Sequence, residues 1–304
     1  IGIEDKIEGI IIPAHILLER HEFLQILPII VALPVLDLKI LQKLACLCAH
    51  ILGEGFEVGF GLFADFRPFF LQLLLFFVLL LAALLPAIIL LIRVYKLDKI
   101  EKEPRPLLVK LVIVGALSGV AASLIEAVLT RLLNRYYSGS ELGYLLLENF
   151  VAVALVEELC KHWPVRRFAW KHPAFDYRFD AVVYCVFSAL GFAALENILY
   201  VAQFGLSVAV PRALLSVPGH FFFAVYMGIY LGEAKRAERE GEGYLRDRFL
   251  RESILVPVLL HGFWDFSLSV NSPWMTAAFY AFVLVFFLSA NHRLRAASED
   301  DQQL

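Results

Sequence analysis

Several ionisable residues lie inside long apolar segments of this chain, where inserting each one into a bilayer costs about 2.5–3.5 kcal/mol. Residues that costly need either a structural partner or a function. Carboxylates and imidazoles brought together in a dry site can activate water, transfer protons or hold a metal ion. The residues concerned are Glu157, Glu158, Lys161, Glu196, His220, His261 and Asp265, with Asn197 next to Glu196.

The spacing of these residues predicts shared helix faces. Positions four apart lie one above the other on a helix, so Glu157 lies over Lys161 and His261 lies over Asp265. Four consecutive apolar segments each offer one polar face, and we expect these faces to converge on an active site or a conduction path. Taken singly, Lys161 can also reach the interface and each histidine can be a hydrogen-bonded core residue. Glu126 has the same insertion cost and no role in this scheme.

The composition indicates the elements that position these residues. Of the 304 residues, 60% are hydrophobic and only 19% are charged, and the mean hydropathy is +0.72, which is too apolar for a chain that folds in water. A transmembrane helix needs about 20 mainly apolar residues. We therefore predict an all-α, polytopic membrane bundle of about seven transmembrane helices in contact with the lipid bilayer: 69–92, 107–133, 145–161, 180–203, 213–231, 254–270 and 274–290.

Basic residues gather in alternate connections between these segments. The connections 93–105, 161–178 and 235–251 are rich in Lys and Arg, whereas 134–143, 204–212 and 271–273 hold few or none. The positive-inside rule then predicts a multi-pass protein of the cell membrane with a cytoplasmic C-terminus. A net charge of -3 argues against nucleic-acid binding, and four cysteines without a CxxC pair argue against a disulfide framework or a thiolate zinc site.

Three regions follow from these patterns. Residues 1–65 stay unassigned, because their apolar runs are short and interrupted by prolines and charges. Residues 66–296 form the predicted membrane-embedded domain. Residues 297–304 are polar and are predicted to be a disordered tail.

Common intramembrane protease signatures are missing from the chain. There is no HExxH zinc motif, no GxSG and no GxGD. If the predicted helices are straight, Glu157 falls toward the cytoplasmic side and Glu196 toward the outer side of the membrane. A single active site therefore requires tilt or a broken helix near Trp163 and Pro164.

Four other motifs follow one another on successive segments. They are EExxK at 157–161, FxxxEN at 192–197, a histidine at 220 and HGxxD at 261–265. In this order and spacing they resemble the PrsW family of intramembrane proteases, which is related to the CAAX prenyl proteases and bacteriocin-processing membrane proteins. The stretch 95–104 also resembles that family, so the similarity extends over about 93–270.

The resemblance implies an intramembrane endopeptidase whose substrate is a single-pass membrane protein such as an anti-sigma factor. Peptide hydrolysis needs an activated water, a stabilised oxyanion and a proton for the leaving amine. Glu157 is then expected to serve as base and acid, with Lys161 holding its carboxylate. Glu158 points about 100° away and is expected to be structural or a second base.

The resemblance leaves two catalytic alternatives open, because the family is commonly called a metalloprotease while its CAAX relatives are also argued to be metal-free glutamic proteases. With a metal, Glu196, His220 and His261 would hold zinc, and Asp265 would fix the tautomer of His261. Without a metal, Glu157 and Glu196 would hold the water. His261 and Asp265, with His220 nearby, would then stabilise the oxyanion.

Two other classes of function compete with the protease. Relays of Glu, His and Asp across helices also conduct protons, so a proton-coupled transporter or channel fits the polar residues, although no internal repeat is visible. An inactive membrane scaffold could instead bind a partner helix through the small residues Gly115, Gly119 and Ser123.

Overall fold

The computed structural model describes residues 67–304, with side chains from residue 77 onward. The chain divides into two compact units, residues 1–81 and 82–304. The described part of the first unit is the beginning of helix α4, and the helices from α5 onward belong to the second unit. The unassigned region 1–65 lies outside the described residues.

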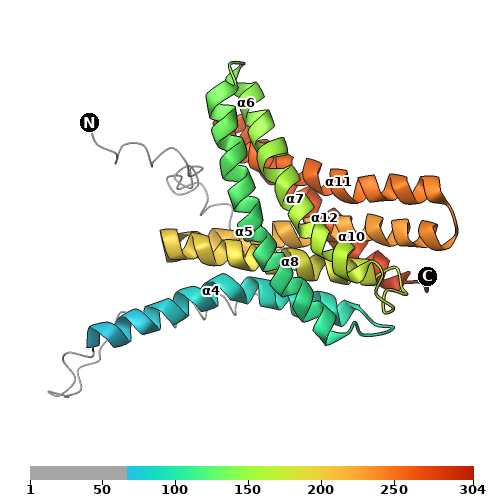
Figure 1. The fold of residues 1–304 in the computed structure, drawn as a ribbon. Coiled ribbons are helices and arrows are strands. Elements are labelled where there is room, and N and C mark those ends of the chain that lie inside the picture. The colour runs from blue at the N-terminus through green and yellow to red at the C-terminus, as the bar shows by residue number, and fades with distance from the viewer. Residues whose placement is uncertain (1–66) are drawn as a thin grey trace. The chain divides into compact units, whose positions relative to one another are not determined.

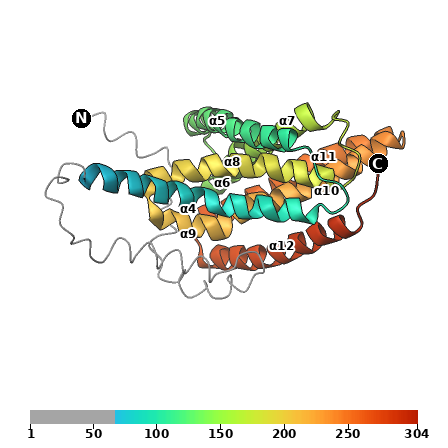
Figure 2. The same cartoon turned by 90° about the horizontal axis from the view of Figure 1, so that it is seen from below.

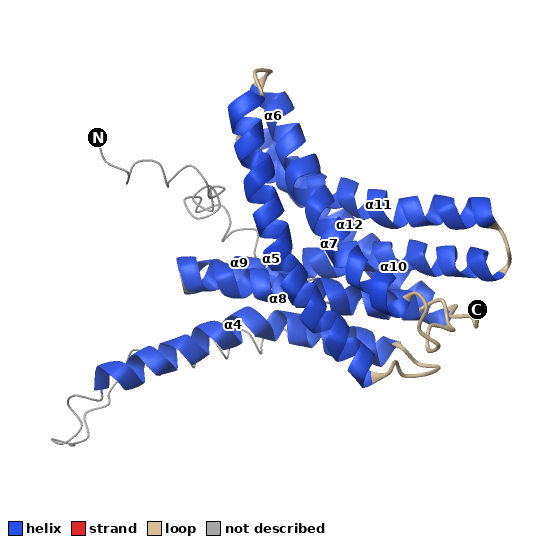
Figure 3. Cartoon of the chain, viewed as in Figure 1, coloured by secondary structure: helices blue, strands red, loops and turns tan. Residues whose placement is uncertain are grey.

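The described residues are helical throughout, with short connections (Figure 3). This confirms the predicted all-α fold class. The α-helices are α4 (Arg67–Leu97), α5 (Arg105–Tyr136), α6 (Glu141–Leu147), α7 (Val156–Pro164), α8 (Asp180–Phe204), α9 (Leu206–Pro211), α10 (Val217–Arg239), α11 (Gly243–Ser269) and α12 (Pro273–Glu299). The π-helical segments are η2 (Glu148–Leu155), η3 (Val165–Ala169) and η4 (Arg212–Ser216).

All seven predicted spans lie in helical segments, and five of these segments are long and apolar enough to cross a membrane. The five are Phe77–Leu97, Arg105–Tyr136, Asp180–Phe204, Leu206–Arg239 and Pro273–Glu299. The other two predicted spans fall in α11 and in the stretch from α6 to η3. These two stretches contain Glu157, Glu158, Lys161, His261 and Asp265 of the predicted site. The protein is therefore a multi-pass membrane protein.

Burial separates central helices from peripheral ones. The apolar windows of the spans Asp180–Phe204 and Leu206–Arg239 are 72% buried, whereas those of the spans containing α4, α5 and α12 are 28% buried. The peripheral helices expose large apolar side chains such as Leu117, Leu124 and Val285, which suit contact with lipid acyl chains. The helices α8 and α10 thus form the centre of the bundle.

Helix α5 crosses α8 at very short range (Figure 1; Figure 2). A Cβ atom added to Gly115 would lie 2.1 Å from the carbonyl oxygen of Ser188, and one added to Gly191 would lie 2.2 Å from that of Val112. Gly119 faces the ring of Phe192. Two of the small residues considered for binding a partner helix, Gly115 and Gly119, therefore pack within this molecule.

The third helical stretch alternates between α and π geometry. It runs from α6 through η2, α7 and η3 without a break in the chain of helical residues. Pro164 lies inside it, and the wider η3 segment begins at the next residue. Single π-helical turns often occur at functional sites because they change the direction of side chains. Figure 1 shows α10 and α11 as a hairpin running beside this stretch.

The last residues of the chain lie against the loop before α8. Helix α12 continues to Glu299, and Asp301 accepts a hydrogen bond from the backbone N–H of Phe179 at 2.9 Å. The backbone of the last residues bonds to the loop before α8, with Leu304 N donating to Asp176 O at 2.6 Å. The polar tail is ordered because its groups find partners in that loop.

The connection between α4 and α5 is held by what we call the juxtamembrane cluster, whose members are Asp98, Glu103, Asp180 and Tyr184. All four are buried. The Tyr184 hydroxyl donates a hydrogen bond to Glu103, which also shares a hydrogen bond with Asp180. Burial raises the pKa of Glu103 to about 7, partly offset by these hydrogen bonds. Burial likewise raises the pKa of Asp98 to about 6.

Candidate active site

Four helices contribute the residues singled out by the sequence. We call the site cluster the residues Glu157, Glu158 and Lys161 of α7, Glu196 of α8, His220 of α10, and His261 and Asp265 of α11. The contacts described below bring all of them together. Helix α8 packs against both α7 and α10, and α11 packs against α10 and α7, so the faces predicted to converge meet in the interior.

Lys161 lies at the centre of the site cluster. Its side chain is fully buried, and its Nζ donates to Glu157 Oε2 and to Glu158 Oε1, both at 2.8 Å. The Nζ also lies 2.9 Å from His220 Nδ1. Since an ammonium group has no acceptor, His220 Nδ1 must accept, and the proton of the neutral ring then lies on Nε2.

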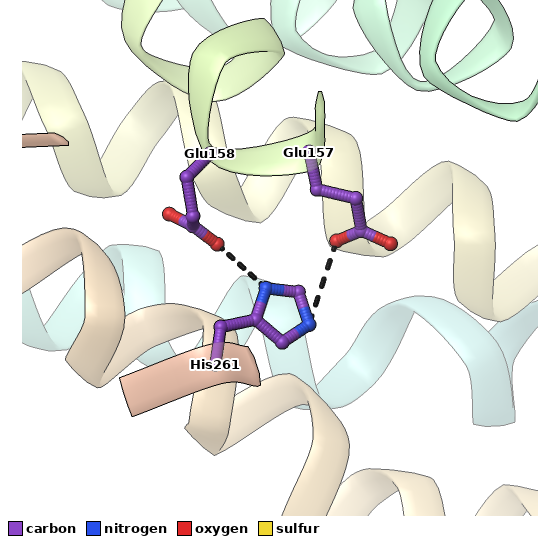
Figure 4. Close-up of side chains that lie close together, drawn as sticks. All are labelled: Glu157, Glu158 and His261. Carbon is purple, nitrogen blue, oxygen red and sulfur yellow. Dashed lines mark hydrogen bonds and ion pairs between the residues drawn. The ribbon is translucent and has the colours of Figure 1, made fainter. Parts of the chain in front are cut away.

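Three carboxylates, those of Glu157, Glu158 and Asp265, surround His261. Its Nδ1 lies 2.9 Å from Glu158 Oε1, and its Nε2 lies 3.8 Å from Glu157 Oε2 (Figure 4). The Nε2 atom also lies 3.1 Å from Asp265 Oδ2. The ring stacks on Phe223 at a centroid distance of 5.0 Å. Its orientation is therefore fixed by carboxylates at its edges and an aromatic ring on its face.

The two neighbouring glutamates of α7 differ in their access to solvent. The Glu158 side chain is 0% exposed, whereas that of Glu157 is 9% exposed. The contacts from Glu157 to Lys161, His220 and His261 all use Oε2, which leaves Oε1 to accept a proton. Of the two carboxylates, Glu157 is thus better placed to meet a water molecule.

Glu196 is held from two sides by residues that follow it in the chain. Its Oε2 lies 2.9 Å from His220 Nε2, and its Oε1 lies 2.9 Å from a terminal nitrogen of Arg212. The next residue, Asn197, is fully buried and donates to the carbonyl oxygen of Ala83 at 2.7 Å. Asn197, expected from the sequence to be a supporting residue, therefore links α8 to α4 through this hydrogen bond.

Arg212 is absent from the residues selected by sequence. It was assigned to a connection between spans, whereas the structure places it at the start of η4, with its side chain only 13% exposed. The signal that could have identified it is a lone cation at the edge of an apolar segment, eight residues before His220. Glu126 also stays outside the hydrogen-bond network, since its Oε1 is buried without a hydrogen-bond partner.

Two groups of donor atoms among the described residues could hold a metal ion. One is Glu157, Glu196 and His220, and the other is Glu157, Glu158 and His261, with the ligand atoms of each group within 4.8 Å of one another. In the second group, both ring nitrogens of His261 already face carboxylate oxygens. His220 likewise has Lys161 and Glu196 at its ring nitrogens. Each group offers two carboxylates and one imidazole, the donors that catalytic zinc takes, so the residues of either group fit a metal ion. Of the three metal ligands expected from the sequence, Glu196 and His220 lie in the first group and His261 lies in the second.

Comparisons with known proteins show which family the chain is similar to. The profile of a family described as PrsW family intramembrane metalloprotease matches residues 103–290, which include the whole site cluster. The chain is 33% identical over 207 residues to Protease PrsW of Clostridioides difficile, covering 67% of this chain and 84% of that protein. It is 34% identical over 217 residues to Protease PrsW of Oceanobacillus iheyensis, covering 71% and 94%. Protease PrsW of Bacillus subtilis is 33% identical over 190 residues, covering 62% and 82%. No solved structure matches the chain.

Proposed function

Because the chain belongs to the PrsW family of intramembrane metalloproteases and is a peptidase, we propose that the site cluster is its active site. In this proposal Glu157 activates the water that attacks the peptide carbonyl. Glu196, His220 and His261 complete the constellation, with Asp265 and Glu158 holding His261.

One observation carries the proposal. Glu157 has a carboxylate oxygen within 4.0 Å of both His220 and His261, and its ligand atom lies within 4.8 Å of that of Glu196. These residues come from four helices and from positions up to 104 apart in the chain. Such a concentration of carboxylates and imidazoles inside an apolar bundle is costly unless it serves a function.

The roles follow from the contacts. Glu157 takes a proton from water through its more accessible carboxylate while Lys161 holds Oε2 in place. The water oxygen bonds to the carbonyl carbon, and His261, with His220 nearby, is assigned the stabilisation of the oxyanion that forms. Glu157 then returns its proton to the leaving amine as the C–N bond breaks.

A metal ion, with zinc as the first candidate, would be held by Glu157, Glu196 and His220. When bound there, it would polarise the carbonyl and lower the pKa of its water. Because His220 Nδ1 accepts from Lys161, the ring proton lies on Nε2, and holding a metal through Nε2 requires that proton to leave. Without a metal, Lys161 orients His220 by donating to Nδ1.

We further propose that the substrate is a single-pass membrane protein, such as an anti-sigma factor, and that the enzyme lies in the cell membrane with its C-terminus in the cytoplasm. The central position of α8 and α10 among the spans supports cleavage in or near the bilayer. The alternation of basic connections supports the orientation.

The test is cleavage of a panel of single-pass membrane proteins in liposomes, followed by mass spectrometry of the products. Glu157→Gln should lower the rate at least about 100-fold, because it removes the base without changing the size of the side chain. Glu141→Gln, at an exposed carboxylate of α6, is the matched control and should cleave like the wild type. Equal cleavage by wild type and Glu157→Gln would remove Glu157 from the mechanism.

Elemental analysis of the same preparations addresses the metal. A stoichiometric metal that is lost in His220→Ala and kept in Glu141→Gln supports the proposed ligands. Active wild-type protein without bound metal would end the metal-dependent alternative.

A further inference from the structure

Arg212 makes three contacts to one short stretch of α8. A terminal nitrogen lies 2.9 Å from Glu196 Oε1, and Nε donates to Asn197 Oδ1 at 2.8 Å. The guanidinium carbon lies 3.9 Å from the centroid of the Tyr200 ring. The same guanidinium group is thus bound by residues on one face of α8, within one helical turn of Glu196.

These contacts fix the orientation of the Arg212 side chain. The Asn197 amide accepts at the edge of the guanidinium plane, and the Tyr200 ring covers its face. Asn197 is in turn tied to the backbone of Ala83 in α4. The side chain of Arg212 is therefore oriented by the Asn197 amide, which is itself tied to α4, and by the Tyr200 ring. One terminal nitrogen then lies 2.9 Å from Glu196 Oε1.

Glu196 is held at both of its oxygens as a result. Arg212 lies at Oε1 and His220 at Oε2, each at 2.9 Å. Both partners belong to the segment Arg212–Arg239, in which η4 leads directly into α10. A carboxylate with one oxygen held by a guanidinium group cannot rotate freely away from the imidazole at its other oxygen.

We propose that Arg212 is a positioning residue of this enzyme, which holds the Glu196 carboxylate so that Oε2 faces His220 and the reacting water. This inference rests on the role proposed above for Glu196. It assigns to the start of η4 a function that acts through Glu196 and involves no contact with the substrate.

The geometry requires arginine and not any cation. A guanidinium group can donate to Asn197 through Nε while a terminal nitrogen forms an ion pair with Glu196. A lysine ammonium is a point charge that cannot span both acceptors and stack on Tyr200 in the same way. Arg212→Lys should therefore recover only part of what Arg212→Gln loses.

The first test measures kinetics with a single-pass substrate that the wild type cleaves in liposomes. Arg212→Gln should lower kcat about 10- to 100-fold, as for other groups that orient active-site ligands, with KM within about twofold. Arg212→Lys should fall between the two, and added guanidinium ion should partly restore Arg212→Ala. The control Arg131→Gln, at an exposed arginine of α5, should behave like the wild type.

A double variant separates this inference from the proposed function. If Arg212 acts through Glu196, then Arg212→Gln should add less than about twofold to the loss caused by Glu196→Gln. Multiplicative losses, or an unchanged kcat in Arg212→Gln when Glu196→Gln is inactive, would overturn the positioning role alone. Full activity of Glu196→Gln would overturn the role of Glu196 itself.

Infrared spectroscopy tests the same inference without a substrate. In protein labelled with 13C-glutamate, the carboxylate band that disappears in Glu196→Gln reports that side chain directly. We expect this band to shift in Arg212→Gln and to stay in place in Arg131→Gln. An unshifted band in Arg212→Gln would show that the guanidinium group does not hold Glu196.

Discussion

The site cluster and the juxtamembrane cluster both bury carboxylates, but they compensate the buried groups differently. In the site cluster, Lys161 binds Glu157 and Glu158, and Arg212 lies against Glu196. In the juxtamembrane cluster, Glu103 has a tyrosine hydroxyl and a second carboxyl group as partners. Carboxylates of the first set have cations beside them, whereas Glu103 in the second set shares a hydrogen bond with another carboxyl group.

This difference matters because the two clusters should respond with opposite sign to the removal of a charge. Removing a cation from the site cluster leaves buried carboxylates unpaired, which is strongly destabilising. Removing a negative charge from the juxtamembrane cluster relieves a desolvation cost. Three substitutions test the contrast, and each can be followed by reversible unfolding in mild detergent.

The largest effect is expected for Lys161→Met. It preserves the apolar stem but leaves Glu157 and Glu158 buried without their cation, so the free energy of unfolding should fall by about 3–5 kcal/mol. The exposed Lys171 of the α7–α8 connection offers the control Lys171→Met, which should change stability by less than about 0.5 kcal/mol.

Neutralising the partners of Lys161 should restore part of the stability that Lys161→Met loses. The triple variant with Glu157→Gln and Glu158→Gln should recover part of the lost stability, because no unpaired charge remains. If Lys161→Met were as stable as the wild type, Lys161 would not be compensating these carboxylates.

An intermediate effect of opposite sign is expected for Glu103→Gln. The pKa of Glu103 is raised by burial from 4.5 to about 7, so the folded state binds the proton more tightly than the unfolded state. Its stabilising contribution is complete below about pH 4.5 and is lost as the pH rises to about 7. Glu103→Gln should therefore be more stable than the wild type at pH 8, by at most about 3 kcal/mol, and nearly equal to it at pH 4.

The pH profile is the measurement that decides this case. Unfolding of wild type, Glu103→Gln and the exposed control Glu101→Gln should be compared from pH 4 to pH 8. A wild-type stability that does not decline relative to Glu103→Gln over this range would mean that Glu103 is ionised without cost in the folded protein.

The smallest effect is expected for Tyr184→Phe. The substitution removes the hydroxyl that donates to Glu103 but keeps the ring in its edge contact with Phe175, at a centroid distance of 5.5 Å. The free energy of unfolding should fall by about 1–2 kcal/mol. Tyr244→Phe, at a side chain that is 76% exposed, should have no effect. A loss as large as that of Lys161→Met would contradict the contrast between the clusters.

Much of the fold and part of the site could be predicted from local patterns. The membrane class and the helical segments follow from runs of apolar residues, which need no knowledge of neighbouring helices. The shared face of Glu157 and Lys161 follows from helical periodicity, and the ion pair between them has the expected i, i+4 spacing. The contacts of the last residues could not be predicted in this way, because their partners, such as Phe179, lie more than 100 positions away.

What the sequence by itself determined is therefore the all-α membrane fold class, the family and the set of polar residues that deserve an explanation, because each depends on composition, order or short-range spacing. Only the tertiary structure decided how these residues are paired. The contact of Lys161 with His220 spans 59 positions, and that of Glu158 with His261 spans 103. The tertiary structure likewise decided that Arg212 reaches Glu196 and that Glu103 is buried beside Tyr184, since both depend on how helices cross and what each crossing removes from solvent.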